Sequence, residues 1–195
     1  IRYISNYSSG KQGYEIAKQL ANKGAEVILI SGPTNIQPPQ NVKLIKVKTA
    51  DEMLIQTNKQ NKKIDVAVFC AAIADFKVKK MSNKKIKKNS LTTLKLIKNI
   101  DILKKISTQK TNRPKFIVGF SAETGGKILA KKKLEEKNCD MIIFNKISKK
   151  NKVFGLDENK ISILTKNKIV NYSKFSKLKC ANLILDSIYN EIKNK

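Results

Sequence analysis

Hydrophobic and polar positions along this chain follow two periods, one typical of helices and one typical of buried strands. Apolar residues recur every three or four positions at Tyr14, Ala17 and Leu20, whereas a continuous apolar run at 25–31 indicates a buried strand. The pattern predicts helices at about 11–23, 49–58, 128–137 and 178–192, strands at 25–31, 42–47, 65–70, 116–121 and 140–145, and a closing hairpin of 161–164 with 169–172. Such alternation is typical of an α/β fold, a doubly wound Rossmann-like parallel sheet with helices on both faces.

A lysine-rich segment at residues 77–98 interrupts this alternation. Its one strand-like piece is the short alternating run Leu94-Lys95-Leu96. We therefore expect this segment to be an excursion from the main sheet.

The residues before the first predicted helix form a candidate phosphate seat. Ser8, Ser9 and Gly10 come just before the leading backbone N–H groups of a helix, which have no internal partner and carry the positive end of the helix dipole. A serine-capped helix start would use the same residues. Small and polar residues also follow predicted strands at 31–32, 71–75 and 121–124, and parallel strands end at one edge of a sheet, where ligands bind.

Composition limits the chemistry available. Histidine is absent, which excludes Ser-His-Asp and Cys-His catalysis and His-containing zinc sites. Cys70, Cys139 and Cys180 are far apart and form no Cys-x-x-Cys pair, so we expect reduced thiols that fill the core. No apolar run reaches the roughly 20 residues that span a bilayer, and we expect a soluble cytoplasmic protein with no membrane partner.

The formal net charge of +26 raises the possibility of a nucleic-acid partner, because dense positive charge attracts phosphate backbones. Of the 41 basic residues, however, only Arg2 and Arg113 are arginines, whereas proteins that read bases and phosphates favour arginine's planar fork. We therefore expect no nucleic acid to bind, and most lysines to form a solvated surface that steers small anions. A lysine-rich nucleic-acid-binding module is the non-enzyme alternative.

Five segments together carry a resemblance to a known family. They are residues 2–13 (RYISNYSSGKQG), 70–76 (CAAIADF), 84–88 (KKIKK), 94–103 (LKLIKNIDIL) and 119–124 (GFSAET). In this order the set resembles phosphopantothenate–cysteine ligase, the synthetase half of the bifunctional bacterial coenzyme A biosynthesis protein. The resemblance spans nearly the whole chain.

The resemblance implies a reaction in two steps. CTP, with Mg²⁺ on the nucleotide, would activate the carboxylate of phosphopantothenate as an acyl-cytidylate and release pyrophosphate. The amine of cysteine would then displace CMP to form an amide. The resemblance also implies a homodimer formed through the 77–98 excursion and a possible upstream flavin-dependent decarboxylase domain.

The family's functional residues map onto this chain position by position. Asn6 and Lys85 match catalytic residues, at the acyl centre and in a basic lid, and Ala71 and Ala72 join Asn6 in substrate binding. The matching nucleotide-binding positions are Ser8, Ser9, Gly10, Asp75, Lys85, Ile100, Asp101, Ile102, Leu103, Phe120, Lys133 and Lys137. Phe120 would pack on the cytosine, and no protein group is assigned to a metal.

One matched turn departs from the family pattern. Ile100 replaces the proline of the family's Asn-Pro-Asp-Ile-Leu turn, which makes the backbone less rigid. Apart from the match, Lys85, Lys133 and Lys137 look like solvated lysines.

A nicotinamide-dependent oxidoreductase is the enzyme alternative. Tyr14 and Lys18 have the Tyr-x-x-x-Lys spacing of short-chain reductases. The pair lies on the helix next to the phosphate seat, and the chain has no G-x-G-x-x-G fingerprint, so we favour the ligase.

Residues 1–195 are expected to form a single ligase domain. Members of the resembled family have a further strand and a Thr-Ala-Gly-Gly-Thr turn before the signature, and this sequence begins inside the signature. We therefore expect residues 1–195 alone to be aggregation-prone and nearly inactive, because apolar faces stay uncovered and phosphate donors are missing.

Overall fold

The computed structural model describes residues 4–60, 64–82, 93–123, 126–146 and 157–194. Its helices are α1 (Lys11–Asn22), α2 (Ala50–Gln60), α3 (Ile102–Ser107), α4 (Lys127–Glu136) and α5 (Lys177–Lys193). Its strands are β1 (Val27–Ser31), β2 (Val42–Lys46), β3 (Val66–Phe69), β4 (Phe76–Val78), β5 (Leu96–Lys98), β6 (Phe116–Glu123), β7 (Met141–Lys146), β8 (Glu158–Thr165) and β9 (Ile169–Ser176).

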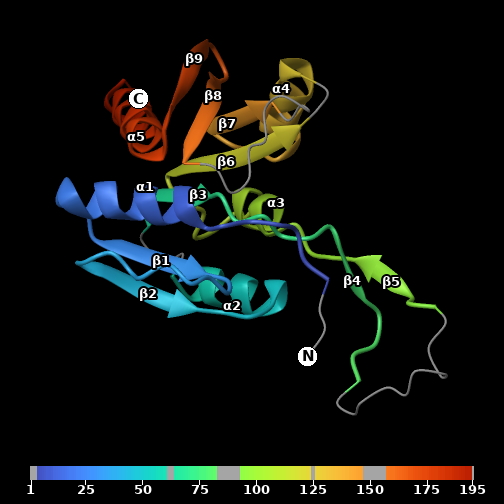
Figure 1. Cartoon of the computed structure of the whole chain (residues 1–195). Coiled ribbons are helices and arrows are strands. Elements are labelled where there is room, and N and C mark those ends of the chain that lie inside the picture. Colours follow the sequence, from blue (N-terminus) through green and yellow to red (C-terminus); the bar gives the residue numbers. More distant parts are fainter. Residues whose placement is uncertain (1–3, 61–63, 83–92, 124–125, 147–156, 195) are drawn as a thin grey trace.

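Most strands form one mixed sheet in the order β3-β6-β7-β8-β9 (Figure 1). β3, β6 and β7 run parallel, with Val66 opposite Phe116 and Val118 opposite Met141. β8 and β9 continue the sheet as antiparallel strands, and β1 pairs with β2 in a separate parallel sheet. Parallel strands connected by helices confirm the predicted α/β class.

The predicted helices and strands are all present, although the closing hairpin β8–β9 is longer than expected. α3 was not predicted, because six residues are too few to show a helical period. The short strand expected at 94–96 lies instead at Leu96–Lys98, where it pairs with β4. Within the described residues, no helix is both long enough and apolar enough to cross a membrane.

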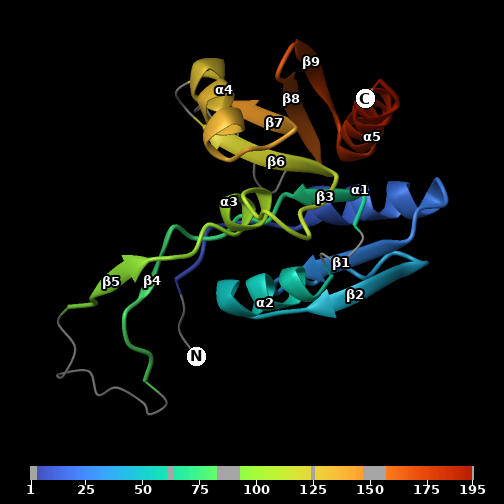
Figure 2. The same ribbon diagram turned by 180° about the vertical axis from the view of Figure 1, so that it is seen from behind.

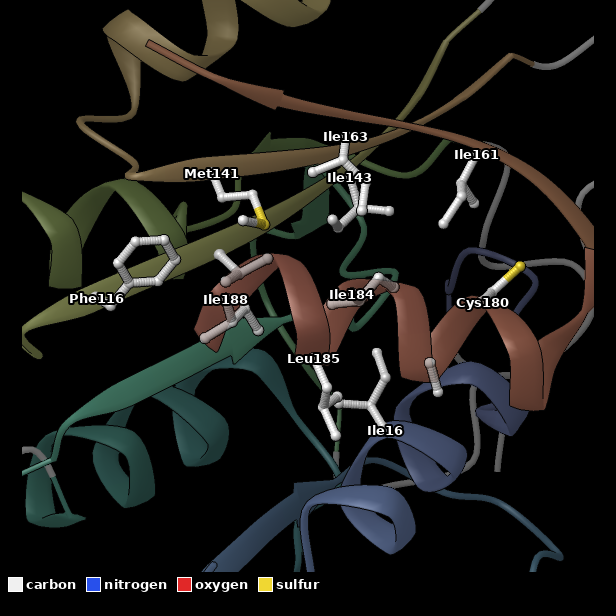
Figure 3. Packing of buried hydrophobic residues seen from close by; sticks show 12 residues of the cluster. Ile16, Phe116, Met141, Ile143, Ile161, Ile163, Cys180, Ile184, Leu185 and Ile188 are labelled. Carbon is white, nitrogen blue, oxygen red and sulfur yellow. The ribbon is translucent and has the colours of Figure 1, made fainter. Parts of the chain in front are cut away.

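One face of the main sheet is covered by α5 and α1. Ile184 and Ile188 of α5 are at most 5 % exposed and pack in one cluster with Ile143 of β7 (Figure 3). Ile16 of α1 joins this cluster beside Leu185. Burial of one such side chain contributes about 1.5–3 kcal/mol, so this layer is a main source of stability.

The opposite face is covered by α3 and α4. Ile106 of α3 and Leu134 of α4 are buried against Ile142 and Phe144 of β7. Two partly buried residues of α2, Met53 and Leu54, extend the same cluster. Helices therefore lie on both faces, as predicted.

Helices join the β1–β2 sheet to the main mixed sheet. In the described residues, β1 is hydrogen-bonded only to β2, and β3 only to β6. α1 packs on β1 and on α5, while α2 packs on β1 and on α3. Every residue of β1 and of β3 is only partly buried. Among the described residues, β1, β2 and β3 thus each have one unpaired edge.

β4 and β5 form an antiparallel arm that extends away from the rest of the molecule in both views (Figures 1 and 2). Apolar residues on it face solvent, including Phe76, Leu96 and Ile97. The described ends of the predicted excursion thus pair as a short ribbon with apolar side chains exposed on it.

α1 approaches the end of β3 closely at Gly13. A Cβ atom at Gly13 would lie 2.8 Å from Sγ of Cys70, closer than real Cβ contacts occur. Burial raises the pKa of the Cys70 thiol to about 11. Cys70 is therefore a neutral packing group at physiological pH, and Gly13 sets the height of α1 above the strand end.

Gly13→Ala should lower the free energy of unfolding by about 1–3 kcal/mol, because overpacking outweighs the better helix propensity of alanine. In a Cys70→Ala background, which lacks Sγ, the same substitution should be neutral or stabilising by up to about 1 kcal/mol. Chemical denaturation of the four variants measures this coupling. Gly32→Ala is the control, because a Cβ atom there meets nothing within 4 Å. Equal losses in both backgrounds would contradict the steric explanation.

Candidate active site

The residues of the predicted phosphate seat lie around Gly10, the residue before α1. Gly10 has a φ of 73°, in the left-handed region that favours glycine, and its N–H donates to Oγ of Ser8 at 3.4 Å. Oγ1 of Thr34 donates to the carbonyl oxygen of Ser9 at 3.5 Å, and it would lie 3.4 Å from a Cβ atom at Gly10. Two loops therefore shape the seat. The leading N–H groups of α1, which a helix cannot pair internally, are the natural donors to an anion here.

Asn6 lies against the loop that follows β3. Its Nδ2 donates to the carbonyl oxygen of Ile73 at 3.0 Å, although the two residues are 67 positions apart. Asn6 itself is exposed, and so is Ala71 in the same loop, while Ala72 is half-buried. The hydrogen bond orients the carboxamide, which keeps its acceptor oxygen and its second N–H as polar groups on an accessible surface.

A second set of hydrogen bonds joins this loop to the turn before α3. The backbone N–H of Asn99 donates to the carbonyl oxygen of Asp75 at 2.7 Å, and its Nδ2 donates to that of Ala74 at 3.0 Å. Its Oδ1 accepts from the N–H of Ile100 at 3.0 Å. A proline has no N–H to make this last bond, so Ile100 fixes the turn by a contact that the proline it replaces cannot form.

Asp101 caps α3 and pairs with Lys137. Its Oδ1 accepts from the N–H of Lys104 at 3.0 Å, and Oδ2 accepts from Nζ of Lys137. Burial acts to raise the pKa of Asp101, but the hydrogen bonds from Lys104 and Lys137 outweigh it and hold the pKa below its usual 3.8. The carboxylate is therefore ionised throughout the physiological range.

Lys133 and Lys137 both fall in the helix predicted at 128–137, but only Lys133 lies within α4. α4 ends at Glu136, so Lys137 lies just past it, where Oγ of Ser107 donates to its carbonyl oxygen. Lys133 is half-buried within α4. Sequence periodicity extended the helix by one residue, and the ammonium of Lys137 is held by Asp101.

The end of β6 brings a buried hydroxyl toward the same edge of the sheet. A Cβ atom at Gly119 would lie 2.8 Å from Cδ2 of Leu103, so the absence of a side chain lets α3 pack directly on β6. Two residues further along this face, Ser121 is 4 % exposed, and its Oγ has no hydrogen-bond partner in the described part of the chain. Such a buried hydroxyl costs about 1–3 kcal/mol, which makes Ser121 a candidate ligand-binding group.

The remaining predicted positions are spread around this centre. Phe120 is half-buried against the cluster under α5, on the face of β6 opposite to Leu103. The structure therefore does not bring Phe120 together with the turn at 100–103. Asp75 is exposed at the start of the arm, and Lys85 lies outside the described residues.

Two residues that shape the candidate site, Thr34 and Asn99, were not predicted from the sequence to do so. Thr34, which shapes the seat, follows directly after the Gly32-Pro33 stop of β1, and its place at a strand end was the available signal. Asn99 was only part of a motif, and two of its three hydrogen bonds go to the distant loop at Ala74 and Asp75. Sequence spacing alone cannot reveal such long-range partners.

The oxidoreductase alternative fits this geometry poorly. Tyr14 is 5 % exposed, and its hydroxyl donates to Oγ of Ser31 at 3.2 Å, so it serves as a core residue that links α1 to β1. Among the described residues, no three Cys, Asp or Glu side chains gather as a metal site.

A helix N-terminus beside two hydrogen-bonded loops at the ends of parallel strands is an arrangement typical of nucleotide- and phosphate-binding α/β domains. The family model for the DNA/pantothenate metabolism flavoprotein C-terminal domain matches residues 1–192. The chain belongs to this family, which confirms the resemblance found in the sequence.

Curated relatives and solved structures agree with this assignment. The chain is 43 % identical over 190 residues to the Coenzyme A biosynthesis bifunctional protein CoaBC of Haemophilus influenzae, which covers 96 % of this chain and 47 % of the relative. CoaBC of Borreliella burgdorferi is 40 % identical over 193 residues, with 97 % and 48 % covered. The chain thus spans about half the length of the curated relatives it matches.

The crystal structure of the C-terminal domain of CoaBC matches with a TM-score of 0.83 and 32 % identity, covering 100 % of this chain and 89 % of that one. The DNA/Pantothenate Metabolism Flavoprotein from Streptococcus pneumoniae matches with a TM-score of 0.79, covering 97 % and 92 %. It is 20 % identical and supports the fold alone.

Asp101→Asn keeps a helix cap but removes the charge that pairs with Lys137. Because the folded pKa is lowered, the carboxylate stabilises the fold above the unfolded value of 3.8, and this contribution is lost as the pH falls through the folded pKa. The difference in unfolding free energy between wild type and Asp101→Asn should therefore be constant near neutral pH and shrink below pH 3.8. Asp101→Ala should cost a further 0.5–2 kcal/mol or so through loss of the cap. Urea titrations at several pH values test this, and a difference unchanged in acid would contradict it.

Proposed function

We propose that this chain is the phosphopantothenate–cysteine ligase domain of a coenzyme A biosynthesis protein and that it uses CTP. Membership of the family supports the pathway. The observation that carries the proposal is the convergence of the phosphate seat at Gly10, the carboxamide of Asn6 and the turn at Asn99 on one edge of the fold.

Each part of this edge suits one requirement of the reaction. The leading N–H groups of α1 suit a phosphate, whether that of phosphopantothenate or of the nucleotide. Asn6 is four residues before Gly10 in the chain, and its oriented carboxamide suits the acyl carbon, where charge develops. The turn of Asn99 to Leu103 suits the nucleotide, with Ser121 as a further hydroxyl. Lys85, as a lid residue, and Lys133 and Lys137, as nucleotide contacts, belong to the proposal, whereas Phe120 is left out because it lies on the opposite face of β6 from the turn.

The surface charge suits the two anionic substrates, the nucleotide and phosphopantothenate. Among the described residues of the arm, Lys77 and Lys98 lie at the end nearest the loop that holds Asn6, with Nζ of Lys77 paired to Asp51, and Lys79 and Lys95 lie farther along it. A lysine-rich surface raises the local concentration of triphosphate and phosphopantothenate and speeds association. Mg²⁺ would come with the nucleotide.

We also propose two completions of the domain. The unpaired edges of β1 and β3 would both be satisfied by one further strand lying between the two parallel sheets. The exposed apolar residues of the β4–β5 arm would be covered in a homodimer. An upstream flavin-dependent decarboxylase domain would fit the bifunctional relatives.

The test is an assay with CTP, phosphopantothenate and cysteine in which pyrophosphate and CMP are measured separately. We expect equal amounts of both products when all three substrates are present, and far less turnover with ATP. The assay should compare residues 1–195 with the same chain extended by its upstream sequence, and the extended form should be the more active and the more stable. Absence of both products from both forms would overturn the ligase, and salt-sensitive DNA or RNA binding without turnover would favour the nucleic-acid module.

Asn6→Ala should leave pyrophosphate release largely intact while it suppresses amide formation, because the lost carboxamide acts at the acyl centre and not on the triphosphate. Loss of one charge-stabilising donor typically lowers the affected step by about 10²–10³-fold. The measurement is the ratio of pyrophosphate to CMP in single turnover, together with recovery of a trapped acyl-cytidylate.

Asn22→Ala is the matched control, since Asn22 is an exposed asparagine at the other end of α1. It should change neither product. If Asn6→Ala lowers pyrophosphate and CMP by the same factor, the assignment of Asn6 to the second step is wrong.

A further inference from the structure

The phosphate seat depends on the first turn of α1, and this turn has no apolar side chain to anchor it. Residues 10–13 are Gly, Lys, Gln and Gly, and the first buried hydrophobic residue of the helix is Tyr14. On one side of the turn, Gly13 packs against Cys70, but Gly13 has no side chain that could anchor the turn. Hydrophobic packing therefore holds the body of α1 but cannot fix the position of its first turn.

Polar contacts from the far end of the chain reach this turn on the other side. Nδ2 of Asn159, at the start of β8, donates to Oε1 of Gln12 at 2.9 Å, and Nε2 of Gln12 donates to the carbonyl oxygen of Lys177 at 3.3 Å. The N–H of Lys177 donates to the carbonyl oxygen of Asp157 at 2.9 Å, so the start of α5 is itself bonded to the residues just before β8. Nζ of Lys11 adds an ion pair to Asp157 at 2.5 Å.

These contacts differ in strength. The Lys11–Asp157 pair is exposed, and such pairs contribute only about 0–1 kcal/mol. Asn159 is 5 % exposed, so the hydrogen bond between its side-chain amide and that of Gln12 is shielded from water. The Asn159–Gln12 hydrogen bond, called the amide link below, is therefore the contact that fixes the first turn of α1.

Asn159 is also an unusual choice for its position. The buried residues that follow on the same face of β8 are Ile161 and Ile163, and Oδ1 of Asn159 has no hydrogen-bond partner among the described residues. A buried polar atom without a partner is destabilising, and an apolar residue would pack here without that cost. Stability alone does not account for the asparagine.

We infer that Asn159 is a positioning residue for the phosphate seat: through Gln12 it holds the first turn of α1 where the leading N–H groups meet the anionic substrate. The inference rests on the proposed ligase function. Asn159 touches no reacting atom in this scheme. It acts by fixing the donors, and displacement of such donors by about 1 Å can lower the rate about 10²-fold.

The test compares Asn159→Ala with Ser162→Ala in the full-length protein that contains this chain. Ser162 lies on the same strand, is 9 % exposed and donates to Oδ1 of Asn171 at 2.9 Å, so its variant also loses one side-chain hydrogen bond, but far from α1. We expect similar shifts in melting temperature for both variants. Only Asn159→Ala should raise the KM for CTP or phosphopantothenate, by at least about tenfold, and speed hydrogen exchange at the amides of residues 14–16, whose bonds to the carbonyl oxygens of residues 10–12 close the first turn.

Two further variants keep the inference falsifiable if Asn159→Ala does not fold. Gln12→Ala should reproduce the effect on KM, and the double Ala variant should be no worse than either single one. The reciprocal exchange Gln12→Asn with Asn159→Gln keeps the amide link and should restore KM and exchange protection. Unchanged KM and exchange in Asn159→Ala, or equal changes in Ser162→Ala, would overturn the inference. Lack of turnover by the wild type would instead count against the ligase, while hydrogen exchange would still test the positioning role.

Discussion

Strands β6 and β7 are buried on both faces, by α5 on one and by α3 and α4 on the other, and the rest of the structure is arranged around this double burial. Val118, Met141 and Ile143 supply one face, while Ile117 and Ile142 supply the other. A one-residue slip in register would move each set of side chains to the opposite face, where it would not fit the helices packed there, so the register is well determined. β3 pairs with β6, so the loop after β3, which accepts the hydrogen bond of Asn6, starts from a strand held in this register.

The site itself is held by polar contacts between loops that are distant in sequence. Asn6 meets the loop after β3, Asn99 ties that loop to α3, and Thr34 meets the seat from the loop after β1. None of these loops has a hydrophobic core of its own. The precision of the site therefore comes from hydrogen bonds made on a frame that apolar packing has already fixed.

The sequence predicted the frame better than the site. Period and apolar runs located the long elements, because burial of β6, β7 and α5 dictates those patterns directly. α3 was not predicted because its six residues are too few to show a helical period, and the packing of Leu103 over Gly119 that holds it in place is a tertiary contact. Gln12 and Asn159 could not be paired from sequence, since 147 residues separate them and no periodicity relates them.

The separation of β1 and β2 from the main sheet has a consequence for ligand binding. A two-stranded parallel ladder has little stability of its own, so this unit is expected to open locally at a lower free energy than the core around β6 and β7. Thr34 belongs to the loop between β1 and β2, so opening of the unit would withdraw one wall of the seat. By linkage, an anion bound at Gly10 would then raise the free energy needed to open β1 and β2. Occupancy of the seat and the order of the β1–β2 sheet would rise together.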